Sequence, residues 1–412
     1  MWSARRLDIE WSDLAAGLAW CVGASESDHR VLGEQTLLCL SARSAFDLLL
    51  SALELPTGSE VLMSAVTIPD MARIVVEHGL IPVPVDLDLP TLAPSWTALE
   101  AALTPNTRVF VVAHLFGSRV PLDALVEFAR ARNLLVIEDL AQGFAGWPEP
   151  FPSPADASLY SFGPIKSATA IGGGLARISD REFVAKIWRL QSQQPRQSRL
   201  AMAQRLLKYA VLKAVSQRLF YSPLVGAMRL CGRDFDRLFA ELVRGFPGPG
   251  LLTKLRKRPS DALLQLLLRR LRRFDLAQIA DRAAHAQRLL SRLEGQFYTP
   301  GVDASMHSHW AVPILSNDPG QLIAELLCHG FHATQSRSLT AIAPPPGRND
   351  RAPLESQRLI REAVFLPIYS QMSEAERDRL ASTLLQLRAL AAKAPTPGRT
   401  CETLAVATSA SN

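Results

Sequence analysis

The sequence predicts an α/β fold in which a mostly parallel sheet carries helices on its faces. From about residue 36, short apolar segments alternate with helical ones, a pattern typical of parallel strands joined by helices. The segment Val109–Ala113 is continuously apolar and rich in valine, which suits a strand buried on both faces. The predicted strands are Leu37–Leu40, Glu60–Met63, Pro82–Asp86, Val109–Ala113, Leu134–Ile137, Ala157–Phe162 and Gly174–Ile178.

Helices are expected between these strands. The segment Ser44–Leu55 is followed by Pro56, and Met71–His78 is followed by Gly79. Proline cannot continue a helix and glycine readily adopts the left-handed conformation at its end, so both residues mark helix ends. A third helix is predicted for Leu122–Arg132.

The chain divides into four segments. We expect a large domain at 1–194, a helical insertion at 195–275, a smaller α/β domain at 276–391 and a disordered tail at 392–412. The tail is rich in Ala, Thr and Ser, a composition that favours disorder. In the smaller domain we predict the strand Trp310–Ile314 and the helices Ile279–Leu293, Pro319–His329 and Ser373–Leu390.

The composition is that of a globular protein, with 48% hydrophobic and 20% charged residues among 412. The five cysteines form no C-x-x-C pair, so we expect free thiols in a reducing compartment. Arg5 and Arg6 are followed by acidic residues and not by an apolar segment, so neither a signal peptide nor a spanning helix is expected. A cytoplasmic protein is predicted, and His307 and His309 alone do not make a metal site.

One segment is strongly basic. Residues 196–275 hold 18 Lys or Arg against 5 Asp or Glu, whereas the rest of the chain holds 27 against 34. An anionic partner is one interpretation, but nucleic acid is disfavoured because no binding motif accompanies the charge. Peripheral contact of 200–230 with an anionic membrane is a second possibility, although its charges surround the helix. A packed helical insertion with a basic rim is the simpler interpretation.

Polar side chains follow several predicted strands, at the sheet edge where open α/β proteins bind ligands. These are His114, Asp139 with Gln142, and Ser161 with Lys166. An acid at a buried strand end requires a cation, and the protonated ring nitrogen of pyridoxal phosphate (PLP) is such a cation. The alternatives are a helix N-cap for Asp139 and a surface lysine beside a flexible glycine loop for Lys166.

The turn from Ser41 to Ser44 lies between a predicted strand and a predicted helix. Free N–H groups at a helix N-terminus attract anions. This turn is therefore a candidate phosphate site, although ordinary capping by Ser41 explains it equally well.

These features together resemble the DegT-type sugar aminotransferases, which are PLP-dependent enzymes of fold type I. The resemblance is good over residues 36–190 and loose over 276–391. Its specific part is Lys166 with the upstream Glu-Asp-x-x-Gln. The matching stretches are SARSAF (41–46), GSEVLMSAVTIPDMARIVVEHGLIPVPVDLD (58–88), VFVVAHLFG (109–117), LLVIEDLAQGFAG (134–146), DASLYSFGPIKSATAIGGGLARISD (156–180) and VFLPIYSQMSEAERDRL (364–380).

The resemblance implies a role for each residue that matches. Lys166 holds the cofactor as a Schiff base and moves the proton between the cofactor and the substrate carbon. Asp139 pairs with the pyridine nitrogen, and Gln142 lies near the ring hydroxyl and the ring face. Ser161 binds the phosphate together with the backbone of Ala42 and Arg43.

The chain departs from the family pattern at two places. Ile68 stands where the family has an aromatic residue stacked on the cofactor ring, so aromatic stacking is lost there. The family's Gly-Tyr-Asn-Tyr-Arg motif, whose asparagine reaches the partner subunit's phosphate, is replaced by Lys254–Arg258. Arg256 falls at the asparagine position, and a guanidinium binds phosphate well. A solvated basic surface is the alternative.

The resemblance implies an aminotransferase that moves an amino group from an amino acid, glutamate above all, to a keto sugar nucleotide in polysaccharide biosynthesis. It also implies a homodimer, because the family's active sites lie between two subunits. Two alternatives stay open: other PLP chemistry on the same fold, and a non-catalytic homologue that binds a partner through the basic insertion.

Overall fold

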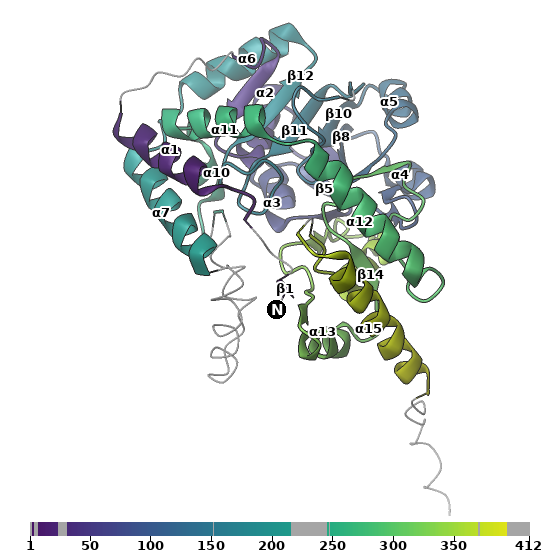
Figure 1. Ribbon diagram of the computed structural model, residues 1–412. Helices are drawn as coiled ribbons and strands as arrows, with labels where there is room; N and C mark the ends of the chain where they lie inside the picture. Colours follow the sequence, from purple (N-terminus) through teal and green to yellow (C-terminus); the bar gives the residue numbers. More distant parts are fainter. Residues whose placement is uncertain are drawn as a thin grey trace, which may run out of the picture.

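The structure is a computed structural model that describes residues 2–3, 7–23, 31–150, 152–215, 245–246, 248–369 and 371–393. Its centre is a seven-stranded sheet in the order β2-β12-β11-β10-β8-β3-β5 (Figure 1). Only β12 runs antiparallel to its neighbours in this sheet, so the predicted α/β class is confirmed. In that order the strands are Thr36–Cys39, Gly174–Ile178, Ala157–Ser161, Leu135–Asp139, Thr107–Ala113, Glu60–Ser64 and Ile81–Val85.

Helices cover both faces of the sheet, because the apolar strand residues alternate between two cores. In β8, Val109 and Val111 belong to one core while Phe110 and Val112 belong to the other. The first core is closed by α2 (Ala42–Leu53), α3 (Pro69–Glu77) and α6 (Arg181–Ser192), and the second by α4 (Trp96–Ala102) and α5 (Asp123–Arg130). Burial on both faces explains the continuous valine segment in the sequence.

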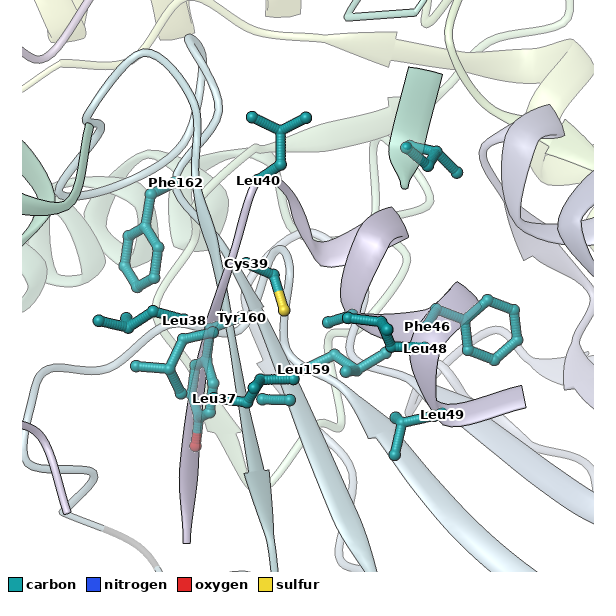
Figure 2. Packing of buried hydrophobic residues seen from close by; sticks show 14 of the residues in the cluster. Leu37, Leu38, Cys39, Leu40, Phe46, Leu48, Leu49, Leu159, Tyr160 and Phe162 are labelled. Carbon is teal, nitrogen blue, oxygen red and sulfur yellow. The ribbon is translucent and has the colours of Figure 1, made fainter. Parts of the chain in front are cut away.

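The first core fixes the helix whose N-terminus faces the carboxyl ends of the strands. Figure 2 shows Leu48 and Leu49 of α2 on the same side of the sheet as Cys39 of β2 and Leu159 of β11. These four residues are at most 2% exposed. Fully burying an apolar side chain of this size contributes about 1.5–3 kcal/mol, so α2 is held firmly against the sheet.

The described parts of 195–275 are helical. They comprise α7 (Arg199–Val215), α10 (Leu251–Leu255) and α11 (Asp261–Arg273), whereas 216–244 lie outside the described residues. Helix α1 (Trp11–Val22), which was not predicted, packs against both α7 and α11 (Figure 1). These helices contribute buried leucines to the first core, so this part of the chain packs against the large domain. The division of this part of the chain into a domain at 1–194 and an insertion at 195–275 stays a prediction.

The C-terminal residues build a smaller α/β unit around a separate core. It consists of α12 (Ala277–Leu293), β14 (Pro313–Leu315), α13 (Pro319–Cys328), β15 (Phe331–His332), α14 (Leu354–Glu362), β17 (Ala363–Phe365) and α15 (Glu374–Lys393). The predicted strand at Trp310 is wrong at its start, since β14 begins at Pro313. The backbone of Trp310 instead turns against Gly117, whose missing side chain leaves room for it. Of the predicted tail, 394–412 lie outside the described residues.

Short strand pairs complete the described structure. They are β1 (Trp2–Ser3) with β15, β4 (Val66–Thr67) with β16 (Thr340–Ala341), β6 (Leu87–Asp88) with β7 (Ala93–Pro94), and β9 (Ser118–Arg119) with β13 (Met306–His307). A short 3-10 helix spans Asn349–Arg351. The β4–β16 and β9–β13 pairs join the smaller unit to loops of the large domain.

Two other expectations concern cysteines and membranes. Cys21, Cys39 and Cys328 are free thiols, while Cys231 and Cys401 lie outside the described residues. In the described part of the chain, no helix has the length and apolar composition required to cross a membrane.

A buried arginine ties α11 to the N-terminal segment and to the loop that follows β11. Arg270 is 6% exposed. Its Nη1 donates to Asp13 Oδ2 (2.7 Å), its Nη2 to the Asp8 carbonyl (2.7 Å) and its Nε to the Thr169 carbonyl (3.0 Å). The Thr169 hydroxyl in turn donates to the Gly163 carbonyl (2.6 Å). The loop 163–169 is therefore braced at both ends.

We expect Arg270→Leu to destabilise the protein, because it leaves buried acceptors without their donor. Breaking a buried ion pair by removing one partner costs about 3–5 kcal/mol. Urea unfolding followed by circular dichroism measures this cost as a lower midpoint. Arg272→Leu, at an exposed position of the same helix, is the matched control. Equal midpoints for the two variants would contradict the bracing role of Arg270.

Candidate active site

The carboxyl ends of three neighbouring parallel strands carry the polar residues singled out in the sequence. Strand β10 ends at Asp139, which is in register with Ala113 of β8 and Leu159 of β11. His114 follows β8 directly, and Ser161 is the last residue of β11. Lys166 lies in the turn after β11, where its N–H donates to the Gly163 carbonyl (3.0 Å). The sheet thus brings these residues to one edge.

Lys166 is partly exposed and lies beside an aromatic side chain. Its Nζ lies 4.3 Å from the centre of the Trp310 ring, a cation–π distance. Burial lowers the pKa of Lys166 to about 8, although Asp139 opposes this shift, and Arg43 adds to it. A lysine with this pKa is partly unprotonated near neutral pH, so it can act as a nucleophile or a base.

Asp139 is the anion that Lys166 faces. Burial raises the pKa of Asp139, while the Ala141 N–H, which donates to Oδ1 (2.9 Å), and the charge of Lys166 oppose that rise. The two residues influence each other without a direct ion pair. The residues after Asp139 form a turn and not a helix, so Asp139 is not a helix N-cap. Its carboxylate therefore has capacity for a cation placed between it and Lys166.

A buried network fixes Glu138 beside Asp139. His114 Nε2 donates to Glu138 Oε1 (2.7 Å), and the Ser158 hydroxyl donates to Oε2 (2.8 Å). His114 Nδ1 accepts from the Val120 N–H (2.9 Å), which requires the proton on Nε2. Burial acts to raise the pKa of Glu138, but hydrogen bonds led by that from His114 lower it to about 2. No role for His114 could be assigned from the sequence, and the structure gives it a positioning one.

The turn before α2 forms the other side of the site. Ser41 caps helix α2 by accepting a hydrogen bond from the Ser44 N–H (3.1 Å). The backbone N–H groups of Ala42 and Arg43 lie in the first turn of this helix. Gly174 abuts the Ser41–Ala42 peptide so closely that a side chain would not fit. The turn is thereby brought next to the end of β11 and its Ser161.

Arg43 supplies a cation at this turn. Its Nη1 pairs with Asp70 Oδ2, and its guanidinium lies 4.7 Å from the centre of the Phe246 ring. Its charge also lowers the pKa of Lys166, so Arg43 and Lys166 lie within electrostatic range.

Two predicted site residues have their side chains engaged within the chain. Gln142 Oε1 accepts from the Phe116 N–H (2.9 Å), which leaves its amide N–H₂ as a donor. Arg256 Nε and Nη2 both donate to the buried carboxylate of Asp47 (3.1 Å each), and His78 Nε2 contacts the same carboxylate (2.8 Å). This arrangement disfavours Arg256 as a free phosphate ligand, and its predicted role toward a partner subunit stays a prediction.

Three further residues at the site were missed in the sequence: Trp310, Ser308 and Arg282. Arg282 Nε donates to the Ser308 carbonyl (3.0 Å), while Arg282 Nη2 and the Ser308 hydroxyl are buried without a hydrogen-bond partner among the described residues. Burial lowers the pKa of Arg282 to about 10. No motif marked them, because a long helix and a loop far from Lys166 in sequence bring them together.

Comparisons with known proteins found one family model and relatives named for work on nucleotide-linked sugars. The model of the DegT/DnrJ/EryC1/StrS aminotransferase family matches residues 32–212. GDP-perosamine synthase of Caulobacter vibrioides is 33% identical over 162 residues, which cover 39% of this chain and 44% of that protein. UDP-N-acetyl-3-dehydro-alpha-D-glucosamine 3-aminotransferase of Acidithiobacillus ferrooxidans is 34% identical over 152 residues, or 36% of this chain and 41% of that one. The chain thus spans less than half the length of these relatives.

The fold likeness extends further than the sequence likeness. The PLP form of the sugar aminotransferase Spr1654 from Streptococcus pneumoniae matches with a TM-score of 0.67 at 17% identity, covering 94% of this chain and 98% of that one. At this identity the match shows the fold alone. It includes the smaller C-terminal unit, where the sequence resemblance was loose.

We expect Lys166 to react with a small amine reagent at a lower pH than other lysines. Its pKa of about 8, against an ordinary 10.5, means that the unprotonated amine forms as the pH rises through about 8. Asp139→Asn removes the charge that raises this pKa, so the midpoint should fall further. Acetylation with trace acetic anhydride across a pH series, read by peptide mapping, measures both midpoints, with exposed Lys186 as internal control. A midpoint near 10 for Lys166 would contradict its low pKa.

Proposed function

We propose that this chain is a PLP-dependent aminotransferase, because the model of the DegT/DnrJ/EryC1/StrS aminotransferase family matches residues 32–212. The observation that carries this proposal is Lys166, with a lowered pKa, facing Asp139 at the ends of adjacent parallel strands. The acceptor we propose is a keto sugar nucleotide and the donor an amino acid, glutamate first. The names of the two curated relatives, one with a GDP-linked and one with a UDP-linked sugar, support a nucleotide-linked sugar.

The residues at this edge of the sheet fit PLP. An aldehyde requires an amine that is unprotonated near neutral pH, which Lys166 offers. A pyridinium nitrogen requires an anion in a buried setting, which Asp139 offers. A phosphate requires N–H groups and cations, which the first turn of α2 and Arg43 offer. The Ser161 hydroxyl lies beside the lysine turn, within reach of the same region.

When bound, PLP withdraws electrons from the substrate carbon and so makes its proton removable. The chain supplies the rest. Lys166 Nζ moves that proton as general base and then general acid. Asp139 holds the proton on the ring nitrogen, and the His114–Glu138 network keeps Asp139 in place. Trp310 lies over Lys166 Nζ and limits the water that reaches it.

Arg282 and Ser308 offer unused hydrogen-bond donors near Trp310. A carboxylate accepts two parallel bonds from a guanidinium, so we assign these donors to a carboxylate of the amino-acid donor. Ile68, which precedes α3 and is partly exposed, gives the cofactor ring an aliphatic neighbour only. The homodimer, the cytoplasmic location and the membrane contact of 200–230 remain predictions, and 216–230 lie outside the described residues.

We expect the purified protein to bind PLP through Lys166. Borohydride reduction should fix the cofactor on the peptide that contains Lys166, and glutamate added before reduction should convert the bound cofactor to its amino form. Lys166→Ala should abolish this conversion, because it removes the amine that moves the proton. Absorbance spectra and peptide mapping provide the readouts.

The control for this experiment is Lys186→Ala, which removes an exposed lysine of α6. Label on another lysine, or full conversion by Lys166→Ala, would overturn the proposed role. PLP binding without conversion by any amino acid would favour a different PLP reaction. Failure of the intact protein to bind PLP would favour the non-catalytic homologue.

We expect Arg282→Met to raise KM for the amino-acid donor by about 10- to 100-fold, as loss of a charge-assisted hydrogen bond predicts. KM for the sugar acceptor should change little. Steady-state kinetics with each substrate varied in turn separates the two. Arg288→Met, at an exposed position of the same helix, is the control. An equal rise in both KM values would indicate a structural role for Arg282.

A further inference from the structure

Helix α7 carries one arginine on its buried face. Met202, Leu206 and Tyr209 are at most 3% exposed, and their spacing of three and four residues defines a single face of the helix. Arg205 lies on this same face and is partly buried, whereas Arg199 and Lys208 are exposed. The basic residues of α7 therefore differ in environment, and Arg205 is not part of a solvated rim.

This arginine reaches the glycine turn that leads into β12. A side-chain carbon added at Gly172 would lie 2.7 Å from Arg205 Nη1, so the guanidinium packs directly on the turn. Gly173 forms a bridge with Ser41, the N-cap of α2. Arg205 is thus placed beside the two backbone segments that meet at the candidate phosphate turn.

No carboxylate in the described part of the chain pairs with Arg205. Burial lowers the pKa of Arg205, Tyr209 opposes this, and the charge of Arg43 lowers it further. Arg43 also acts on Lys166, so its guanidinium lies within electrostatic range of both. Holding the like charges of Arg205 and Arg43 close together in partly buried positions costs free energy, and a bound anion would offset this cost.

We propose that Arg205 binds the phosphate of PLP from within the same chain, together with the first turn of α2 and Arg43. This inference rests on the proposed function, since PLP is its ligand. A phosphate dianion suits the site because it accepts several charge-assisted hydrogen bonds at once. It also explains how the chain manages without the asparagine of the family motif, since Asp47 engages the Arg256 that replaces it.

Removing the guanidinium should weaken the binding of PLP but not that of pyridoxal, which lacks the phosphate. For Arg205→Met we expect the Kd of PLP to rise about 10- to 100-fold, measured by absorbance titration of the cofactor-free full chain. The Kd of pyridoxal should stay within twofold of the unaltered protein. Arg205→Lys should recover part of the PLP affinity, because it keeps the charge but loses the fork of donors.

The matched control is Arg199→Met, which removes the same charge from an exposed position of α7 and should leave both Kd values unchanged. Unaltered PLP affinity in Arg205→Met, while Lys166 is still labelled by borohydride, would overturn this inference alone. An equal loss of affinity for PLP and pyridoxal would also overturn it, because it would assign Arg205 to helix packing. Failure of the unaltered protein to bind PLP would overturn the proposed function as well.

Discussion

The site depends on the electrostatic relation between Lys166 and Asp139. Asp139 ends strand β10 and Lys166 lies in the turn after β11, and burial alone would drive both toward their neutral forms. The charge of each residue opposes the pKa shift of the other, but the two side chains do not form a direct ion pair. Such an arrangement is costly to fold unless a ligand supplies matching charges. The surrounding hydrogen bonds and helices hold Lys166 and Asp139 at this separation.

Two supports keep the pair in place, one on each residue. On the Asp139 side, His114 and Ser158 saturate Glu138, so the strand end cannot rotate without breaking buried hydrogen bonds. On the Lys166 side, Arg270 binds the Thr169 carbonyl at the end of the lysine turn. The second support comes from α11 and the N-terminal segment, so helices remote in sequence contribute to the geometry of the reactive amine.

Residues whose role follows from a local sequence pattern could be predicted. Residues that long-range packing brings to the site could not. Strand ends place Asp139 and Lys166 at one sheet edge by the general rule for parallel strands. Trp310 was assigned to a strand because its neighbours are apolar, but β14 begins only at Pro313. Arg256 was matched to a motif position, and nothing in its segment indicated the acceptor Asp47, 209 residues away.

The basic segment illustrates the same limit in terms of charge. Its net charge suggested one anionic partner, but the structure divides its arginines among different tasks. Arg270 neutralises a buried carboxylate, Arg256 another, and Arg205 none in the described part of the chain. Counting charge along a sequence cannot separate these cases, because the free energy of each depends on burial and on the nearest opposite charge. Arg205, a partly buried cation with no carboxylate beside it among the described residues, is the informative case, because a bound anion would lower the free-energy cost of its burial.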